Sequence, residues 1–215
     1  MQIEKKVDFV KWFSELDKNS GAVAGGKGAN LAEIYNMKVP VPPGFVVTAQ
    51  AYDYFIEKAG IKEKIKMLLS EINYEDTKQL DEITKIIREL ITTSKLPKEI
   101  EEEILESYES LGASEIQDEM GYATRILKNS SEPIFVAVRS SATAEDLEGA
   151  SFAGQQETFV NVKGNSDLLT SVRKCFASLF TARAVYYRNK KGFAHEKVSL
   201  AVVVQKMIDS DKSGV

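Results

Sequence analysis

A chain of 215 residues, 43% of them hydrophobic, is long enough to bury a substantial core in one large domain or two small ones. Its net charge of −4 lacks the basic excess of nucleic-acid-binding and membrane-surface proteins, so neither kind of partner is expected. The single cysteine, Cys175, excludes a disulfide framework and a paired-cysteine metal site within the chain. It lies in an apolar helical pattern and is expected to be a buried small hydrophobe.

Apolar residues at helical spacing predict several helices, and continuous apolar runs predict interior strands at 135–138 and 200–204. The N-terminus lacks a leader pattern and no apolar run reaches 18 residues, so a cytoplasmic location is expected. Five helices are expected: one after Thr48 as its N-cap, one along an apolar stripe from Leu80 to Leu90, one that starts at Pro97, one capped by Ser166 or Asp167, and one over about 182–190. Strands are expected at 44–47, 134–138, 157–162 and 198–205.

This order of elements predicts a mixed fold, α/β or α+β, with a helical insert. Three stretches differ in composition and predicted structure. Residues 1–59 contain a glycine cluster, residues 60–132 are predicted to be a helical insert, and residues 133–215 are rich in predicted strands. The first and third stretches are expected to form one unit, into which the helical stretch is inserted.

The segment Gly25-Gly26-Lys27-Gly28 opens a helical pattern, where backbone N–H groups and a lysine favour an anion such as phosphate. Residues 21–27 fit most of a P-loop pattern, but Gly28 occupies the position that needs a serine or threonine for the metal. The dinucleotide-binding fingerprint also fails, because Leu31 replaces its third glycine. A glycine-rich turn before an ordinary helix remains the alternative reading.

Arg139 follows an apolar strand and is expected at or just past the strand end, where α/β sheets bind ligands. A guanidinium there can hold phosphate oxygens bidentately. The small residues of 149–158 are typical of a loop that folds closely over a ligand. The alternative is a solvent-exposed turn in which Arg139 forms a surface ion pair.

Together these segments resemble the dikinase family that uses phosphoenolpyruvate, in particular its phosphoenolpyruvate synthase (pyruvate, water dikinase) branch. The resemblance covers most of the chain and is weakest over 60–130. The matching runs are RSSATAEDL at 139–147 and ASFAGQQET at 150–158, which are highly specific, with GGKGANL at 25–31, VPPGF at 41–45, FASLF at 176–180 and VVQKM at 203–207.

The resemblance implies an ATP-grasp nucleotide site. By position, Lys27 and Arg139 would hold ATP phosphates, with Arg139 catalytic. Gly154 would belong to a loop over the phosphates, Thr158 would lie near them, and Gln205 would lie near the adenine or ribose. The whole enzyme of this family converts ATP, pyruvate and water to AMP, phosphoenolpyruvate and phosphate. A histidine on a swivelling domain carries the phosphoryl group between two sites.

The sequence ends at Val215, before the acidic residues that the resemblance implies for Mg²⁺. The phosphohistidine domain and the pyruvate-binding part are also absent, so we expect a fragment that is inactive alone and holds no metal ligands. His195 lacks the small-residue setting of the family's phosphohistidine and is expected in a surface loop. A rifampin-phosphotransferase-like protein, another dikinase ATP-binding domain and a non-catalytic nucleotide-binding module remain alternatives.

Overall fold

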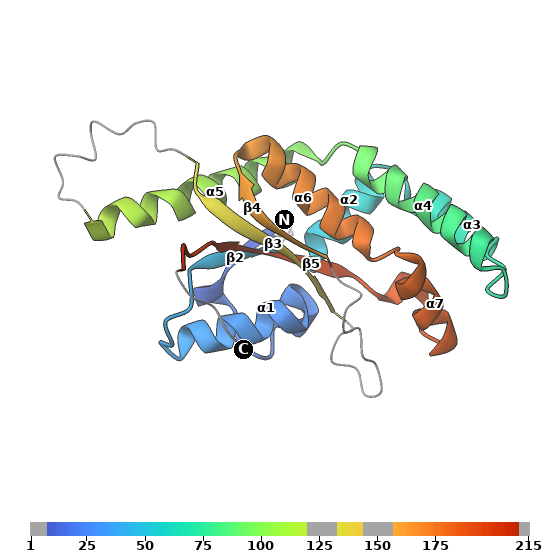
Figure 1. Cartoon of the computed structure of the whole chain (residues 1–215), viewed down its shortest axis with the longest axis horizontal. Coiled ribbons are helices and arrows are strands. Elements are labelled where there is room, and N and C mark those ends of the chain that lie inside the picture. The colour runs from blue at the N-terminus through green and yellow to red at the C-terminus, as the bar shows by residue number, and fades with distance from the viewer. Residues whose placement is uncertain (1–7, 120–132, 144–156, 211–215) are drawn as a thin grey trace, which may run out of the picture.

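The computed structural model describes residues 8–119, 133–143 and 157–210. This part of the chain forms an antiparallel sheet with helices on both faces, so the expected mixture of helices and strands is confirmed (Figure 1). In chain order the elements are β1 (Val10–Trp12), η1 (Phe13–Glu15), α1 (Gly21–Asn36), β2 (Gly44–Val47), α2 (Ala49–Lys58), α3 (Lys62–Ser70), α4 (Thr77–Thr93), α5 (Lys98–Glu119), β3 (Phe135–Ala142), β4 (Thr158–Lys163), α6 (Asn165–Ser178), α7 (Ala182–Lys190), η2 (His195–Lys197) and β5 (Leu200–Lys206).

The strand order in the sheet is β1-β2-β5-β3-β4, and every neighbouring pair is antiparallel. The last strand of the described chain, β5, therefore lies between the strands that precede and follow the helical stretch. The apolar runs in β3 and β5 are interior strands, as their sequences predict, and residues 200–205 of β5 are all buried.

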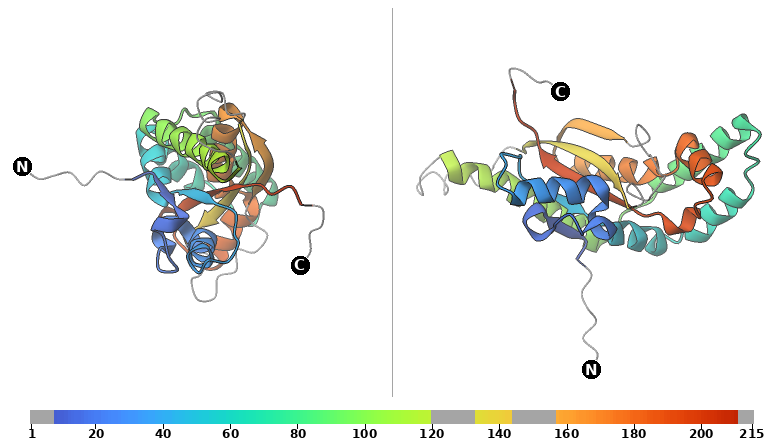
Figure 2. Two further views of the ribbon diagram at one scale, coloured as in Figure 1. Left: turned by 90° about the vertical axis from the view of Figure 1, so that its left-hand side faces the viewer. Right: turned by 90° about the horizontal axis from the view of Figure 1, so that it is seen from below.

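The two faces of the sheet are covered by different helices. Helix α1 packs on one face, where Ala24 and Ala32 join Val46 and Val203 in a small apolar cluster. The helices α2 to α6 cover the other face and form the larger core with residues such as Val202. Figures 1 and 2 show α1 alone on its side of the sheet, with α5 and the α3–α4 pair reaching outward at opposite ends.

The predicted start of α2 is confirmed, because the Thr48 hydroxyl accepts a hydrogen bond from the backbone N–H of Ala51 at 3.2 Å. The predicted cap of α6 is wrong: the helix begins at Asn165 and is preceded by Gly164, not by Ser166 or Asp167. Gly164 has a φ of +88°, which other residues rarely adopt, so a sharp turn at this glycine starts the helix earlier.

Strand β3 continues to Ala142 instead of ending near Val138, so the expected position of Arg139 at a strand end is wrong. Arg139 lies in mid-strand, opposite Thr158 of β4 and Val203 of β5. Pairing on both sides keeps this polar stretch extended. Because the sheet is antiparallel, the rule that ligands bind at the carboxyl ends of parallel strands does not apply here.

The helical stretch is continuous with the sheet in its packing. One core cluster includes Ile87 of α4 and Ile104 of α5 together with Val136 of β3 and Phe176 of α6. The division into 1–59, 60–132 and 133–215 stays a prediction, and within the described residues the three stretches share this core. None of the helices in the described ranges combines the length and the apolar character that crossing a membrane requires.

Candidate functional site

Helix α1 is kinked at Gly25, whose φ of 66° and ψ of 172° are not helical. The regular helix therefore resumes at Gly26, so the glycine cluster lies at a helix start within a longer element. A Cβ at Gly25 would lie 2.3 Å from the carbonyl oxygen of Ser141, so only glycine fits against β3 here. The backbone N–H of Gly28 donates to the Ser141 hydroxyl at 3.1 Å, in a buried contact.

The register of the sheet shows which residues face α1. Residues directly opposite in antiparallel strands share a face, and that face alternates along each strand. Val203 packs beneath α1, and it pairs with Arg139, which in turn pairs with Thr158. Arg139 and Thr158 therefore lie on the α1 face.

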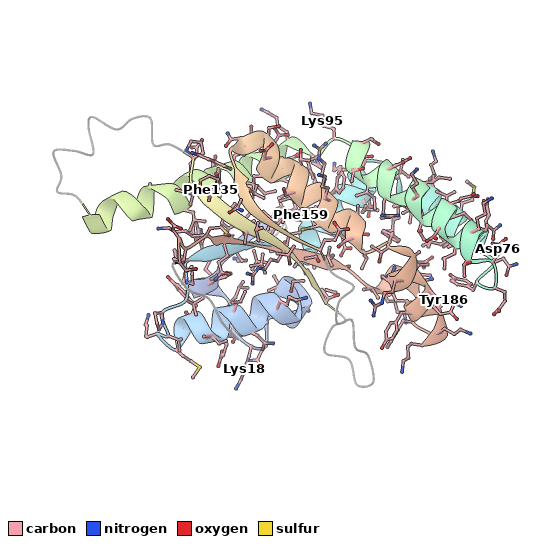
Figure 3. The ribbon with its side chains drawn as sticks, in the orientation of Figure 1. Lys18, Asp76, Lys95, Phe135, Phe159 and Tyr186 are labelled. Atoms are coloured by element: carbon pink, nitrogen blue, oxygen red, sulfur yellow. The ribbon has the colours of Figure 1, made fainter. Side chains whose placement is uncertain are left out.

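The neighbouring residues confirm this alternation. Phe159, next to Thr158, packs with the larger core on the opposite face, and the ammonium group of Lys174 on α6 lies 5.6 Å from its ring centroid. Figure 3 shows Phe159 on β4 beneath α6. Thr158 is itself exposed, so its hydroxyl is accessible beside Arg139.

Helical periodicity places Lys27 on the flank of α1 that looks toward β3. The opposite flank is covered by the chain before α1, since Glu33 accepts a hydrogen bond from the backbone N–H of Lys18 at 3.2 Å. Asn36 is also held there, by the carbonyl oxygen of Leu16 at 2.8 Å. Lys27 lies more than a quarter-turn from Glu33 around the helix, on the side away from this segment.

Gln205 belongs to the same face, because it pairs with Ala137, two residues before Arg139. Its side chain is 7% exposed and its Nε2 donates to the carbonyl oxygen of Pro42 at 3.1 Å. Gly154 lies outside the described residues. The structure thus brings Lys27, Arg139, Thr158 and Gln205 to one face of the sheet, although they are far apart in the sequence.

The Nε of Arg139 is buried, and no hydrogen-bond partner lies within reach of it among the described residues. A buried donor without an acceptor costs about 1–3 kcal/mol, so an anionic acceptor at this place would be favourable. Arg173 and Arg188 each have one such nitrogen as well. The feature is informative at Arg139 because of its position beside the glycine cluster.

A cavity of about 390 Å³ opens at the end of β3, next to the start of α1. Its polar lining includes Asp53, which accepts a hydrogen bond from the Ser199 hydroxyl at 2.7 Å. Burial raises the pKa of Asp53, and that hydrogen bond partly offsets the effect. Lys18 also lines the cavity and is labelled in Figure 3. None of the four site residues above lines this cavity.

His195 is not the surface-loop residue that the sequence suggests. It is partly buried in η2, where its Nδ1 accepts from the Nε of Arg188 at 3.1 Å and its Nε2 lies 3.0 Å from the Tyr74 hydroxyl. Burial and the positive charge of Arg188 lower the pKa of His195 to about 4. Cys175 is fully buried as expected, and burial raises the pKa of its thiol.

The described part of the chain contains no group of three or more histidine, cysteine or carboxylate side chains placed to hold a metal ion. The site residues found above are cationic, amide and hydroxyl groups, which suit phosphate oxygens and not a divalent cation. Lys27, Arg139, Thr158 and Gln205 therefore do not fit a magnesium site by themselves.

Comparison with known proteins identifies the family. Residues 21–215 match the family described as pyruvate phosphate dikinase, AMP/ATP-binding domain. The chain belongs to this family. The match includes every site residue discussed above. The mixed α and β architecture is thus that of a nucleotide-binding domain.

Curated relatives of this dikinase-family chain are phosphoenolpyruvate synthases. A probable phosphoenolpyruvate synthase of Archaeoglobus fulgidus is 51% identical over 206 residues, which are 96% of this chain and 25% of the relative. One from Methanothermobacter thermautotrophicus is 46% identical over 99% of this chain and 29% of its own length. The synthase of Aquifex aeolicus is 42% identical over 98% of this chain and 24% of its own length. The chain thus spans less than a third of these relatives.

Sequence reasoning missed the role of Ser141. Its hydroxyl is the buried partner of the glycine cluster, but the polar run Arg139-Ser140-Ser141 looks like the start of a loop. The alternation of sides along a strand could have linked Ser141 to Arg139 only if β3 had been expected to continue.

Proposed function

We propose that this chain is the ATP-binding N-terminal part of a phosphoenolpyruvate synthase. The complete enzyme would convert ATP, pyruvate and water to AMP, phosphoenolpyruvate and phosphate through a phosphohistidine. The names of the relatives favour this reaction over transfer to rifampin. The pyruvate site and the swivelling phosphohistidine domain would belong to parts of the complete enzyme outside the quarter of its length that this chain matches. ATP is a cytoplasmic metabolite, so the reaction also favours a cytoplasmic location.

The observation that supports nucleotide binding most strongly is the position of Arg139. It lies beside Thr158 on the α1 face and two residues from the serine that contacts the glycine cluster. Its planar guanidinium can hold two phosphate oxygens, and the Lys27 ammonium can add a point charge. Phosphoryl transfer depends mainly on positioning and charge stabilisation, which is the catalytic role proposed for Arg139.

We assign the remaining predicted site residues to parts of ATP on the same α1 face of the sheet. Thr158 would donate its hydroxyl to a phosphate oxygen, Gln205 would lie near the adenine or ribose, and Gly154 would belong to a loop over the phosphates. We infer an ATP-grasp arrangement, in which a second subdomain completes the cleft. The Mg²⁺ that accompanies ATP would take its protein ligands from other residues, because Lys27, Arg139, Thr158 and Gln205 supply no carboxylate.

The test is an NMR-monitored titration of the chain with ATP and magnesium. We expect weak binding, and we expect Arg139→Lys to weaken it by about tenfold or more, because lysine cannot replace a two-pronged contact. Arg173→Lys is the matched control. Arg173 is also partly buried with an unpaired Nε, but it lies on α6, on the opposite side of the sheet.

A folded Arg139→Lys variant that binds ATP as well as the wild type does would make Arg139 a structural residue. Equal losses in Arg139→Lys and Arg173→Lys would point to a general effect of removing a guanidinium. Either result would contradict the proposed site.

A further inference from the structure

Ser141 lies at the contact between α1 and β3. This side chain is fully buried, and its hydroxyl accepts the 3.1 Å hydrogen bond from Gly28, which is 113 residues away in the sequence. On the other side of Lys27, Gly25 leaves no room for a Cβ against the same serine. One serine therefore contacts the backbone on both sides of Lys27.

Ser141 is also tied to Arg139 through the strand itself. The two residues are separated by one position in β3, so they share the α1 face and their Cα atoms lie about 6–7 Å apart. β3 is held on both sides by β4 and β5, which makes it a rigid reference. The Ser141 hydroxyl is thus one of the contacts that set the position of the Lys27 backbone relative to Arg139.

We propose that Ser141 is a positioning residue for ATP binding, which acts by holding Lys27 at the correct distance from Arg139. The inference rests on the proposed function, since it assumes that Lys27 and Arg139 bind the same phosphates. Ser141 itself is fully buried beneath the glycine cluster, so it acts through Lys27 and not by direct contact with ATP. Two cations fixed on rigid elements bind a polyphosphate better than mobile ones, because less freedom is lost on binding.

Ser140 provides a matched control one residue away. It is buried to the same degree, but its hydroxyl bonds to the carbonyl oxygen of Glu157 at 3.2 Å and it faces the opposite side of the sheet. Removing either hydroxyl deletes one hydrogen bond from the same strand. Only the loss at Ser141 should affect Lys27.

The experiment is a double-mutant cycle on the ATP dissociation constant, measured by NMR titration of the chain. Ser141→Ala should weaken ATP binding about 3- to 10-fold in the wild-type background and less than about twofold in a Lys27→Ala background. Ser140→Ala should change the constant by less than about twofold in both backgrounds. If Ser141→Ala does not fold, Ser141→Cys takes its place, since it keeps the side-chain shape with only a weak sulfur acceptor.

An equal loss with and without Lys27 would make Ser141 a general structural residue and overturn the inference. Unchanged binding in Ser141→Ala, with a clear loss in Lys27→Ala, would overturn it while leaving the proposed function intact. A wild-type chain that binds no ATP would instead contradict the proposed function, and the role of Ser141 with it.

Discussion

At the scale of single residues, Gly25 carries two separate constraints. Its φ of 66° belongs to the left-handed region, and the space where a side chain would begin is occupied by Ser141. Gly60 has the same φ of 66°, but nothing lies within 4 Å of the position that its Cβ would take. The two glycines therefore share a positive φ but differ in the space around the Cβ position.

We predict that Gly60→Ala lowers the free energy of unfolding by about 1–2 kcal/mol, the cost of a left-handed backbone. Gly25→Ala should lower it by about 2–5 kcal/mol, because forcing a methyl group against β3 adds about 1–3 kcal/mol. Urea unfolding of both variants measures the difference. Equal values would mean that α1 can move away from β3 at little cost, which would also weaken the case for Ser141 as a fixed reference.

At the scale of elements, Tyr108 links the helical stretch to the sheet. Its hydroxyl on α5 donates to the carbonyl oxygen of Ile134, just before β3, at 2.5 Å. The Tyr108 hydroxyl also accepts a hydrogen bond from the backbone N–H of Gly164, at the turn between β4 and α6, at 3.0 Å. One side chain thus satisfies two backbone groups on either side of the β3–β4 hairpin.

Tyr108→Phe should therefore lower the free energy of unfolding by about 1–3 kcal/mol, since it leaves a partly buried backbone donor and a partly buried backbone acceptor without this partner. The control is Tyr186→Phe on α7, where the tyrosine is 38% exposed and the change should stay within about 0.5 kcal/mol (Figure 3). Chemical denaturation of both variants measures these changes, provided that the dependence of the unfolding free energy on denaturant concentration stays the same as in the wild type. No loss in Tyr108→Phe would show that water replaces the hydroxyl.

Elements with local signals were predictable from the sequence. The Thr48 cap and the interior strands in β3 and β5 depend on residues close together in the chain, and all three are found. The extension of β3 through Arg139 was not predictable, because pairing with β4 and β5 decides it. The start of α6 at Asn165, directly after Gly164, likewise depends on the turn from β4.

The candidate site shows the same limit. Motifs indicated Lys27 and Arg139 as phosphate-binding residues, but the face that they share follows from strand register, which no single segment specifies. Ser141 was missed for this reason, since its partner Gly28 lies 113 residues away. His195 was misjudged because its partner Tyr74 comes from the α3–α4 connection.

At the scale of the whole molecule, one polar network joins the far end of the helical stretch to the segment before β5. Arg188 is 1% exposed, and it donates to His195 and to the carbonyl oxygen of Leu179. His195 in turn meets Tyr74. Burial lowers the pKa of Arg188 to about 10, so it stays charged at neutral pH and disfavours a second cation beside it.

This network predicts a contribution to stability that depends on pH. The pKa of His195 is about 4 when folded and near 6.5 when unfolded, so the unfolded chain binds the proton more readily. The contribution is present above pH 6.5 and is lost as the pH falls from 6.5 toward 4. Because His195 is partly exposed, we expect this contribution to the free energy of unfolding to be only about 1–2 kcal/mol. Glu196 attracts the proton and partly opposes this effect.

The measurement is the free energy of unfolding at several pH values for wild type and His195→Gln, which keeps polar groups but does not titrate there. The difference between the two proteins should change by about 1–2 kcal/mol between pH 7 and pH 4. A constant difference would mean that the imidazole titrates normally in the folded protein.

The central place of β5 also has a consequence for synthesis on the ribosome. A nascent chain makes β1, β2, the helices and the β3–β4 hairpin before it makes residues 200–206, which pair with both β2 and β3. Until those residues emerge, the inner edges of β2 and β3 have no strand between them, and open edges of this kind invite wrong pairing. The joining of the two half-sheets must therefore wait for β5, so we expect slow translation or chaperone binding at that stage to affect how much of the chain pairs correctly.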